Sequence, residues 1–131
     1  MILVDTDVLI WHLRGRPRAG AWLRAARQRG PLAISAVSVA ELTGGMRTGE
    51  RREVRGLLSA FTTEPVTDAV ARRAGDLMRE YRRSHSIGLG DYLIAATVLE
   101  RGHELATLNL RHFPMLPGLS APFDPDAPLP D

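Results

Sequence analysis

The sequence predicts an α/β fold in which helices cover both faces of a central parallel sheet. Short runs of apolar and β-branched residues alternate with longer segments whose apolar residues recur at helical spacing. Glycine and proline residues separate several of these segments, as turns require. Strands that alternate with helices are typical of parallel sheets, in which functional sites gather at the carboxyl ends of the strands.

The first half of the chain contains two predicted strands and four predicted helices. The strands are the apolar runs at 2–6 and 32–35, and the helices lie at 7–13, 19–29, 38–46 and 48–60. Gly30 and Pro31 end the second helix, and Gly44 and Gly45 end the third.

The second half continues the same alternation. Strands are expected at 63–67 and 103–108, and helices at 69–84 and Leu89–Arg101. Residues 117–131 carry five prolines, which favours an irregular C-terminal tail. With 131 residues in all, we expect a single domain spanning 1–131.

The composition narrows the function classes. The chain has no cysteine, which excludes disulfide scaffolds, zinc sites with cysteine ligands and thiol nucleophiles. No apolar run approaches the ~18 residues of a membrane span. No signal peptide is visible either, so we expect a cytoplasmic protein without a membrane partner.

The charge is unevenly distributed. All 17 basic residues are arginines, and residues 14–55 hold ten of them against three acids, a local charge of +7. A basic first half favours a polyanionic partner such as nucleic acid. Arginines on solvated helix faces produce the same pattern, so the charge alone leaves both readings open.

Three acids and one asparagine occupy positions where a parallel sheet places its functional side chains. Asp5 lies at the carboxyl end of the first strand, and Glu41 lies early in the helix after the second. Asp91 opens the most apolar helix, and Asn109 directly follows the fourth strand. These segments should meet at one edge of the sheet, so we expect the side chains to share one cleft.

Carboxylates that share a partly dry cleft repel one another and lose hydration. Either some of them take up protons or a cation binds. Hard oxygen ligands without a nearby cysteine or histidine pattern favour Mg²⁺ or Mn²⁺. Such an ion can activate a water molecule against a phosphodiester.

Each of these residues also has a structural interpretation. Glu41 can form a capping box with Ser38, and Asp91 can be the N-cap of its helix. Asn109 is an ordinary turn or cap residue. His112 lies near the proposed site in sequence, but a packing or surface role is preferred for it.

The first two aspartates are given different roles. Asp5 is expected to end the strand and to face the cleft. Asp7 is expected to start the following helix and to cap the amides of residues 9 and 10.

Four segments in this order resemble the PIN-domain family, and most closely its VapC-type toxin ribonucleases. The segments are LVDTDVLIWHL, ISAVSVAEL, GLGDYLIAATVLERG and LATLNLRHFPMLPGL. The resemblance implies a three-layer α/β/α PIN-like fold around a parallel sheet of four to five strands. It also implies Mg²⁺- or Mn²⁺-dependent cleavage of RNA, a homodimer, and a cognate VapB-type antitoxin whose C-terminal segment lies in the active-site groove.

Carried over by the resemblance, Asp5, Glu41 and Asp91 match the acidic metal ligands of the family. Asn109 stands where some members have a fourth acid, so one metal ion is expected and a second stays open. Our hypothesis is that Asp5 and Asp91 hold the metal and Glu41 binds it directly or through water. Asn109 orients a water or a substrate oxygen, and arginines, including Arg111, engage phosphates.

Two other functions are weighed against this hypothesis. An Asp-x-Asp pair after a first strand also occurs in haloacid-dehalogenase-type phosphatases, but these usually need a lysine and the chain has none. A PIN-like module that binds RNA or a partner without cutting is the second alternative. The RNA target itself cannot be read from a set of arginines.

Overall fold

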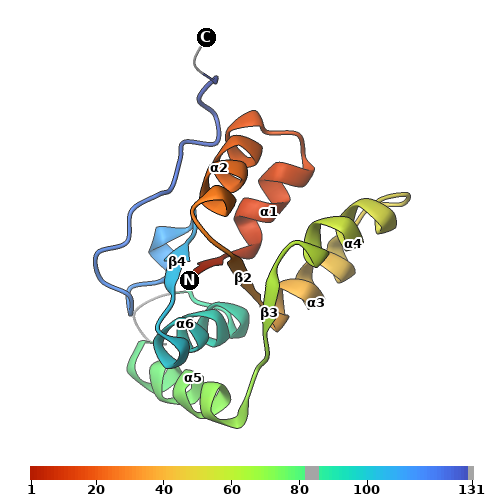
Figure 1. Ribbon diagram of the computed structural model, residues 1–131. Coiled ribbons are helices and arrows are strands. Elements are labelled where there is room, and N and C mark those ends of the chain that lie inside the picture. Colours follow the sequence, from red (N-terminus) through yellow and green to blue (C-terminus); the bar gives the residue numbers. More distant parts are fainter. Residues whose placement is uncertain (82–85, 130–131) are drawn as a thin grey trace.

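The computed structural model describes residues 1–81 and 86–129. In this part of the chain the centre is a four-stranded parallel sheet with the order β3-β2-β1-β4 (Figure 1). The strands are β1 (Ile2–Val4), β2 (Leu32–Ser35), β3 (Thr62–Glu64) and β4 (Glu104–Ala106). Ile2 pairs with both Leu32 and Glu104, which places β1 in the interior of the sheet.

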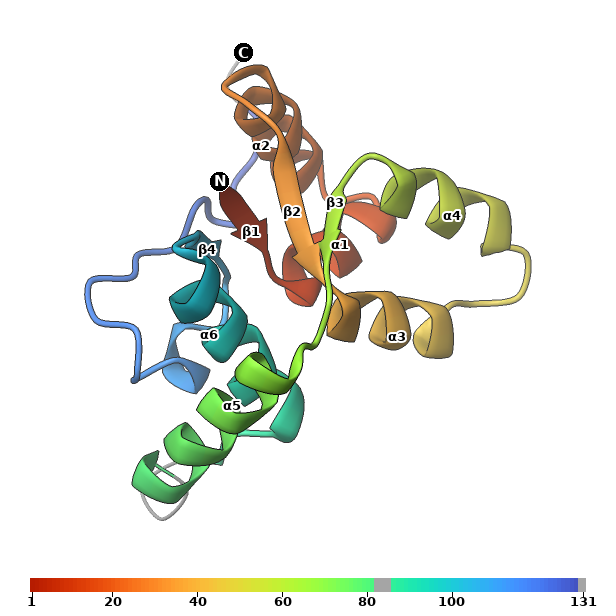
Figure 2. The same ribbon diagram turned by 60° about the horizontal axis from the view of Figure 1, so that its bottom comes forward.

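Six α-helices surround the sheet in the described part of the chain. They are α1 (Thr6–Leu13), α2 (Pro17–Gln28), α3 (Ala36–Gly45), α4 (Arg51–Ser59), α5 (Asp68–Tyr81) and α6 (Leu89–Arg101), followed by a 3₁₀ turn at Leu110–His112. Figure 2 shows α5 and α6 together on one side of the strands and α3 with α4 on the other.

Alternating side chains of the strands divide the core between the two faces. Leu3 and Ala33 pack with the buried residues of α5 and α6. Val4 and Ile34, one residue further along, pack with those of α1, α2, α3 and α4. This period of two produces the three-layer α/β/α arrangement, and the predicted fold class is confirmed.

The strands are shorter than predicted at their polar ends. The first was expected to reach residue 6 but ends at Val4, and the fourth ends at Ala106 rather than 108. Asp5 turns the chain directly into α1, so extended pairing stops there. The predicted helix at 69–84 is found to Tyr81, and its last three positions lie outside the described residues.

Residues 117–129 contain no helix or strand. They run along one side of the molecule from the β4 end towards α2 (Figure 1). Among the described helices, none has the length and apolar character needed to cross a membrane.

Candidate active site

Asp5 ends β1 and caps α1. Its Oδ1 accepts a hydrogen bond from the Thr6 amide at 2.8 Å, and its Oδ2 accepts one from Thr107 Oγ1 at 2.7 Å. Its own amide donates to the Ala106 carbonyl at 2.9 Å, which joins it to β4. Asp5 is only 5% exposed, so a carboxylate is buried at the carboxyl edge of the sheet.

Asp7 lies in the first turn of α1 and turns towards Asp5 rather than capping the helix. Its Oδ2 accepts from the Leu108 amide at 3.0 Å and from Thr107 Oγ1 at 3.3 Å. Its Oδ1 is buried and has no hydrogen-bond partner in the described part of the chain. The prediction that Asp7 is the N-cap is therefore wrong, because α1 begins at Thr6 and Asp5 takes that position.

The two aspartates perturb each other's protonation. Burial raises the pKa of Asp5 to about 7, the negative charges of Asp7 and Asp91 add to this, and hydrogen bonds from Thr107 and Thr6 oppose it. Burial also raises the pKa of Asp7, against hydrogen bonds from the amides of Leu108 and others. Within the described residues, no arginine or histidine forms an ion pair with either carboxylate. The pair thus holds more negative charge than its surroundings neutralise.

Asp91 belongs to a second group of polar side chains. Its Oδ2 lies 3.0 Å from His112 Nδ1, and the same nitrogen lies 2.8 Å from Asn109 Nδ2. Gly88, not Asp91, is the N-cap of α6, but Asp91 Oδ2 accepts from the Gly88 amide at 3.4 Å, so the alternative of a capping role holds in the form of a capping box. The 3₁₀ turn brings the ring of His112, for which the sequence favours a packing or surface role, within 3.0 Å of Asp91.

A single nitrogen of His112 cannot both donate and accept. If Nδ1 carries a proton and donates to Asp91, the Asn109 amide must turn its oxygen towards the ring. If Nδ1 instead accepts from Asn109, its lone pair also faces an oxygen of Asp91, which is unfavourable. The tautomer of the His112 ring and the orientation of the Asn109 amide are therefore linked.

Glu41 reaches the site through Thr6. Thr6 Oγ1 donates to Glu41 Oε1 at 2.8 Å and lies 2.8 Å from Ser38 Oγ. Ser35 caps α3 by accepting from the Val37 amide, so the predicted capping box of Ser38 and Glu41 is wrong.

Gly90 brings the start of α6 close to α3 and Glu41. A methyl group at Gly90 would lie 3.3 Å from Val37 Cγ1 and 3.9 Å from Glu41 Oε2. The small residue allows this close approach, which places Glu41 beside the turn that carries Asp91.

The sequence-predicted residues are thus brought to one edge of the sheet but not into direct contact. Asp5 lies close enough to Asp91 for the charge of Asp91 to raise its pKa. Over residues 1–81 and 86–129, however, no three acidic or histidine side chains converge as a ready ligand set. The donors are nevertheless carboxylate oxygens with unneutralised charge, and one of them, Asp7 Oδ1, is buried without a partner. That donor chemistry fits a hard divalent cation.

The sequence interpretation weighed Asp7 and His112 but gave both of them structural roles, and it did not consider Thr107. The second acid of the Asp-x-Asp pair was the signal for Asp7, and nearness in sequence to Asn109 was the signal for His112. Thr107 carries no comparable signal, since its contacts depend on the turn after β4.

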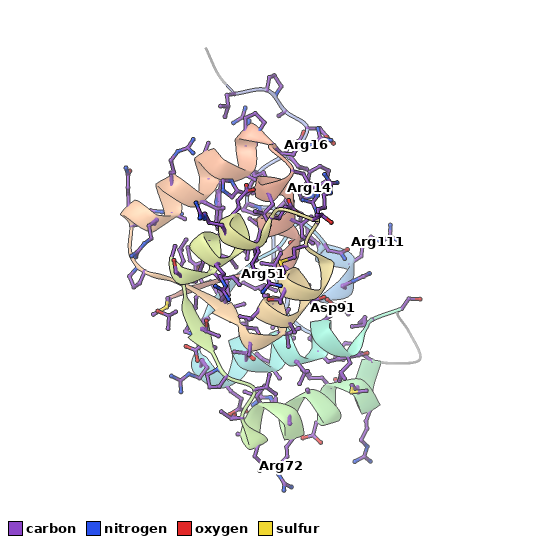
Figure 3. The ribbon with its side chains drawn as sticks, turned by 90° about the vertical axis from the view of Figure 1, so that its right-hand side faces the viewer. Arg14, Arg16, Arg51, Arg72, Asp91 and Arg111 are labelled. Atoms are coloured by element: carbon purple, nitrogen blue, oxygen red, sulfur yellow. The ribbon has the colours of Figure 1, made fainter. Side chains whose placement is uncertain are left out.

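Some arginines lie near Asp91. In the view of Figure 3, Arg51 and Arg111 lie nearest Asp91, Arg14 and Arg16 lie further towards one end of the molecule, and Arg72 on α5 lies towards the other. Arg14 is held at 2.8 Å from Glu50. Cations on this side favour an anionic substrate.

Comparison with known proteins agrees with this architecture. The model of the PIN domain family matches residues 2–116. Ribonuclease VapC10 of Mycobacterium tuberculosis is 64% identical over 124 residues, covering 94% of this chain and 93% of the relative. Ribonuclease VapC19 of the same organism is 41% identical over 125 residues, covering 94% and 100%.

Among solved structures, a toxin-antitoxin complex from Klebsiella pneumoniae contains a chain with a TM-score of 0.77 and 29% identity, covering 95% of this chain and 99% of that one. A chain of FitAcB from Neisseria gonorrhoeae has a TM-score of 0.69 and 29% identity, covering 86% and 91%. This chain is therefore a PIN-domain protein, and it belongs to the VapC ribonucleases within that family.

Proposed function

We propose that this protein is a metal-dependent endoribonuclease and the toxin of a VapBC-type toxin–antitoxin pair. The observation that carries the proposal is the buried Asp5–Asp7 pair, whose negative charge no side chain of the described residues neutralises. The 64% identity to a protein named ribonuclease VapC10 supports the reaction class.

Asp5 and Asp91 would hold a Mg²⁺ or Mn²⁺ ion, Glu41 would bind it directly or through water, and Asp7 would add to the set. Such an ion supplies Lewis-acid stabilisation of the charge that develops on the phosphate. Thr107 keeps the Asp5 carboxylate in place, and Thr6 does the same for Glu41.

His112 and Asn109 act on the other side of Asp91. Through its bond to Asp91, His112 orients that carboxylate and can hold a proton at Nδ1. The contact with the His112 ring fixes the position of the Asn109 side chain. The amide of Asn109 would orient a water or a substrate oxygen.

We also propose a cognate VapB-type antitoxin and a homodimer, in the cytoplasm. The antitoxin is supported by the likeness to a chain of the Klebsiella pneumoniae toxin-antitoxin complex. The lack of a described helix fit to cross a membrane is compatible with this location.

The test is RNA cleavage by the purified protein with Mg²⁺ or Mn²⁺, with EDTA, and for Asp5→Asn. We expect cleavage that EDTA abolishes and that re-added metal restores, and no cleavage by the variant. Activity that survives both EDTA and the substitution would contradict the metal mechanism. A wild-type protein that binds RNA with metal present and never cuts it would favour the non-catalytic binding module.

A further inference from the structure

A cavity of about 710 Å³ opens directly beside the acidic site, between α1 and the C-terminal tail. We call it the tail pocket. It is open to solvent; Asp7 and Asn109 line it on the side of the acidic site, Trp11 lines it from α1, and Phe123, Asp124 and Pro125 line it from the tail. Its volume lies within the range of about 300–1,000 Å³ that is usual for sites that bind small organic groups.

The tail is held against the helices by contacts along its length. The rings of Phe123 and Trp22 lie 6.1 Å apart at 38°. Arg18 Nη2 donates to the Pro128 carbonyl at 2.6 Å, and Arg16 lies 3.5 Å from Asp126. The wall of the tail pocket is therefore part of the folded structure.

Trp11 is held as one side of this pocket. The Arg16 guanidinium carbon lies 4.8 Å from the centre of the Trp11 ring, a cation–π contact that restrains the indole. An indole face beside the proposed site of phosphodiester cleavage is suited to stacking on a base.

We propose that the tail pocket binds the unpaired base of a nucleotide next to the scissile phosphate, stacked on Trp11. This inference rests on the proposed ribonuclease function. Because Asp7 and Asn109 belong to both places, a nucleotide neighbouring the phosphate at the site reaches the pocket. The single-stranded RNA must splay this base out, since a paired base cannot leave its stack without being unpaired first.

The charge of the pocket distinguishes a base from a phosphate. Asp124, on the tail side of the pocket, is an acid outside the proposed metal set, so a phosphate would be repelled there, whereas an N–H group of a base can donate to it. Arg16 covers one face of the Trp11 ring and is itself paired with Asp126 at 3.5 Å, so the base would stack on the opposite face of the indole.

The first experiment uses the wild-type protein and a short single-stranded RNA that it cleaves. Each nucleotide beside the cleavage position is replaced in turn by an abasic one, which keeps the phosphate but removes the base. We expect one position, and no other, at which the abasic substitution raises KM roughly 10-fold to 100-fold. Equal cleavage of all abasic substrates would overturn the proposal.

The second experiment assigns that base to Trp11. In Trp11→Ala the KM for the intact RNA should rise by the same factor as the abasic substitution causes in the wild type. The KM for the abasic RNA should be the same in Trp11→Ala and in the wild type. Trp11→Phe, which keeps an aromatic ring, should retain most of the affinity. A Trp11→Ala enzyme that still discriminates between intact and abasic RNA would overturn the assignment.

The chain has only two tryptophans, which provides a direct binding signal. Trp22→Phe leaves Trp11 as the sole fluorophore, and Trp11→Phe leaves Trp22; both are combined with Asp5→Asn to prevent turnover. Intact RNA should quench Trp11 and leave Trp22 unchanged, and the abasic RNA should not quench Trp11. Quenching of Trp11 that persists with the abasic RNA would count against stacking.

The outcomes separate this inference from the proposed function. Absence of metal-dependent cleavage in the wild type would contradict the proposed function. Normal cleavage with no base dependence at any position would contradict only the tail pocket. If Trp11→Ala lost binding of a partner protein while cleaving both RNAs equally well, the pocket would belong to that partner and the proposal would be wrong.

Discussion

Two carboxylates of this protein are buried to almost the same extent but differ in the charge of their neighbours. Asp5 is 5% exposed and Glu64 is 6% exposed. Glu64 lies at the end of β3, where its two oxygens lie 3.0 Å from Arg101 Nε and 3.2 Å from His103 Nε2. Asp5 receives hydrogen bonds from an amide and a hydroxyl group, and its charged neighbours are further acids.

The difference indicates which buried acid is structural. Glu64 and its partners form a compensated group that joins β3 to the end of α6. The group around Asp5 is uncompensated, and a folded protein retains such a group only when the rest of the structure supports it. The uncompensated carboxylates therefore mark the candidate site, and burial alone would not have distinguished them.

Among the substitutions that test the contrast between Asp5 and Glu64, Asp5→Asn is expected to have the largest effect. This change removes one charge from the proposed metal set while keeping the shape of the side chain. We expect cleavage of RNA to fall ~1000-fold or more, because several kcal/mol of transition-state stabilisation depend on the ion. Single-turnover cleavage assays measure this, and circular dichroism should show an unchanged fold. A variant with near wild-type activity would remove Asp5 from the site.

Asp7→Asn tests whether the negative charge of Asp7 contributes to activity together with that of Asp5. An asparagine can still accept from the Leu108 amide, so the turn should persist, but the negative charge is lost. We expect activity to fall roughly 10-fold to 100-fold, corresponding to about 1.4–2.8 kcal/mol. Comparing kcat and KM of Asp7→Asn and wild type checks this. An unchanged kcat would mean that Asp7 is only structural.

Glu64→Gln tests the compensated group. The change leaves His103 buried without its carboxylate partner, so we expect the free energy of unfolding to fall by about 2 kcal/mol. Arg101 is 60% exposed and should contribute little to the loss. Urea unfolding measures the change, and RNA cleavage below the unfolding midpoint should stay at wild-type level. A large loss of activity in the folded variant would contradict a purely structural role for Glu64.

The raised pKa of Asp5 makes the stability of the metal-free protein depend on pH. The pKa of Asp5 is raised from 3.8 to about 7, so between these values the folded protein binds more protons than the unfolded chain. Metal-free protein should therefore lose stability as pH rises from about 4 to about 7, by ~1–2 kcal/mol because water entering the cleft reduces the full effect.

Thermal unfolding of wild type and Asp5→Asn across this pH range, with EDTA present, provides the measurement. The decline should be smaller in Asp5→Asn, and addition of Mn²⁺ to wild type should oppose it. A decline of equal size in the two proteins would assign the effect to other groups.

The fold could be read from the sequence because its signals are local. The runs around Leu3 and Ile34 are apolar, and the polar residues Asp5 and Ser35 mark the strand ends. Part of the site followed from the same rule, which placed Asp5 and Asp91 at one edge of the sheet.

The rest depended on geometry that no local pattern encodes. The role of Asp7 changed because α1 begins at Thr6, and one residue in the start of a helix redirects a side chain by about 100°. His112 reaches Asp91 only through the 3₁₀ turn after β4. Glu64 and Arg101 are far apart in the chain, and the sequence around neither residue predicts their contact.

The position of the tail has an evolutionary consequence. The family match ends at residue 116, and the wall formed by Phe123 and Asp124 lies beyond it. The carboxylates that would perform hydrolysis all lie within the matched part. Substitution or shortening of the tail could therefore retarget the enzyme to a different RNA without altering its chemistry. Toxins that share one catalytic core could diverge in this way while each remains fully active.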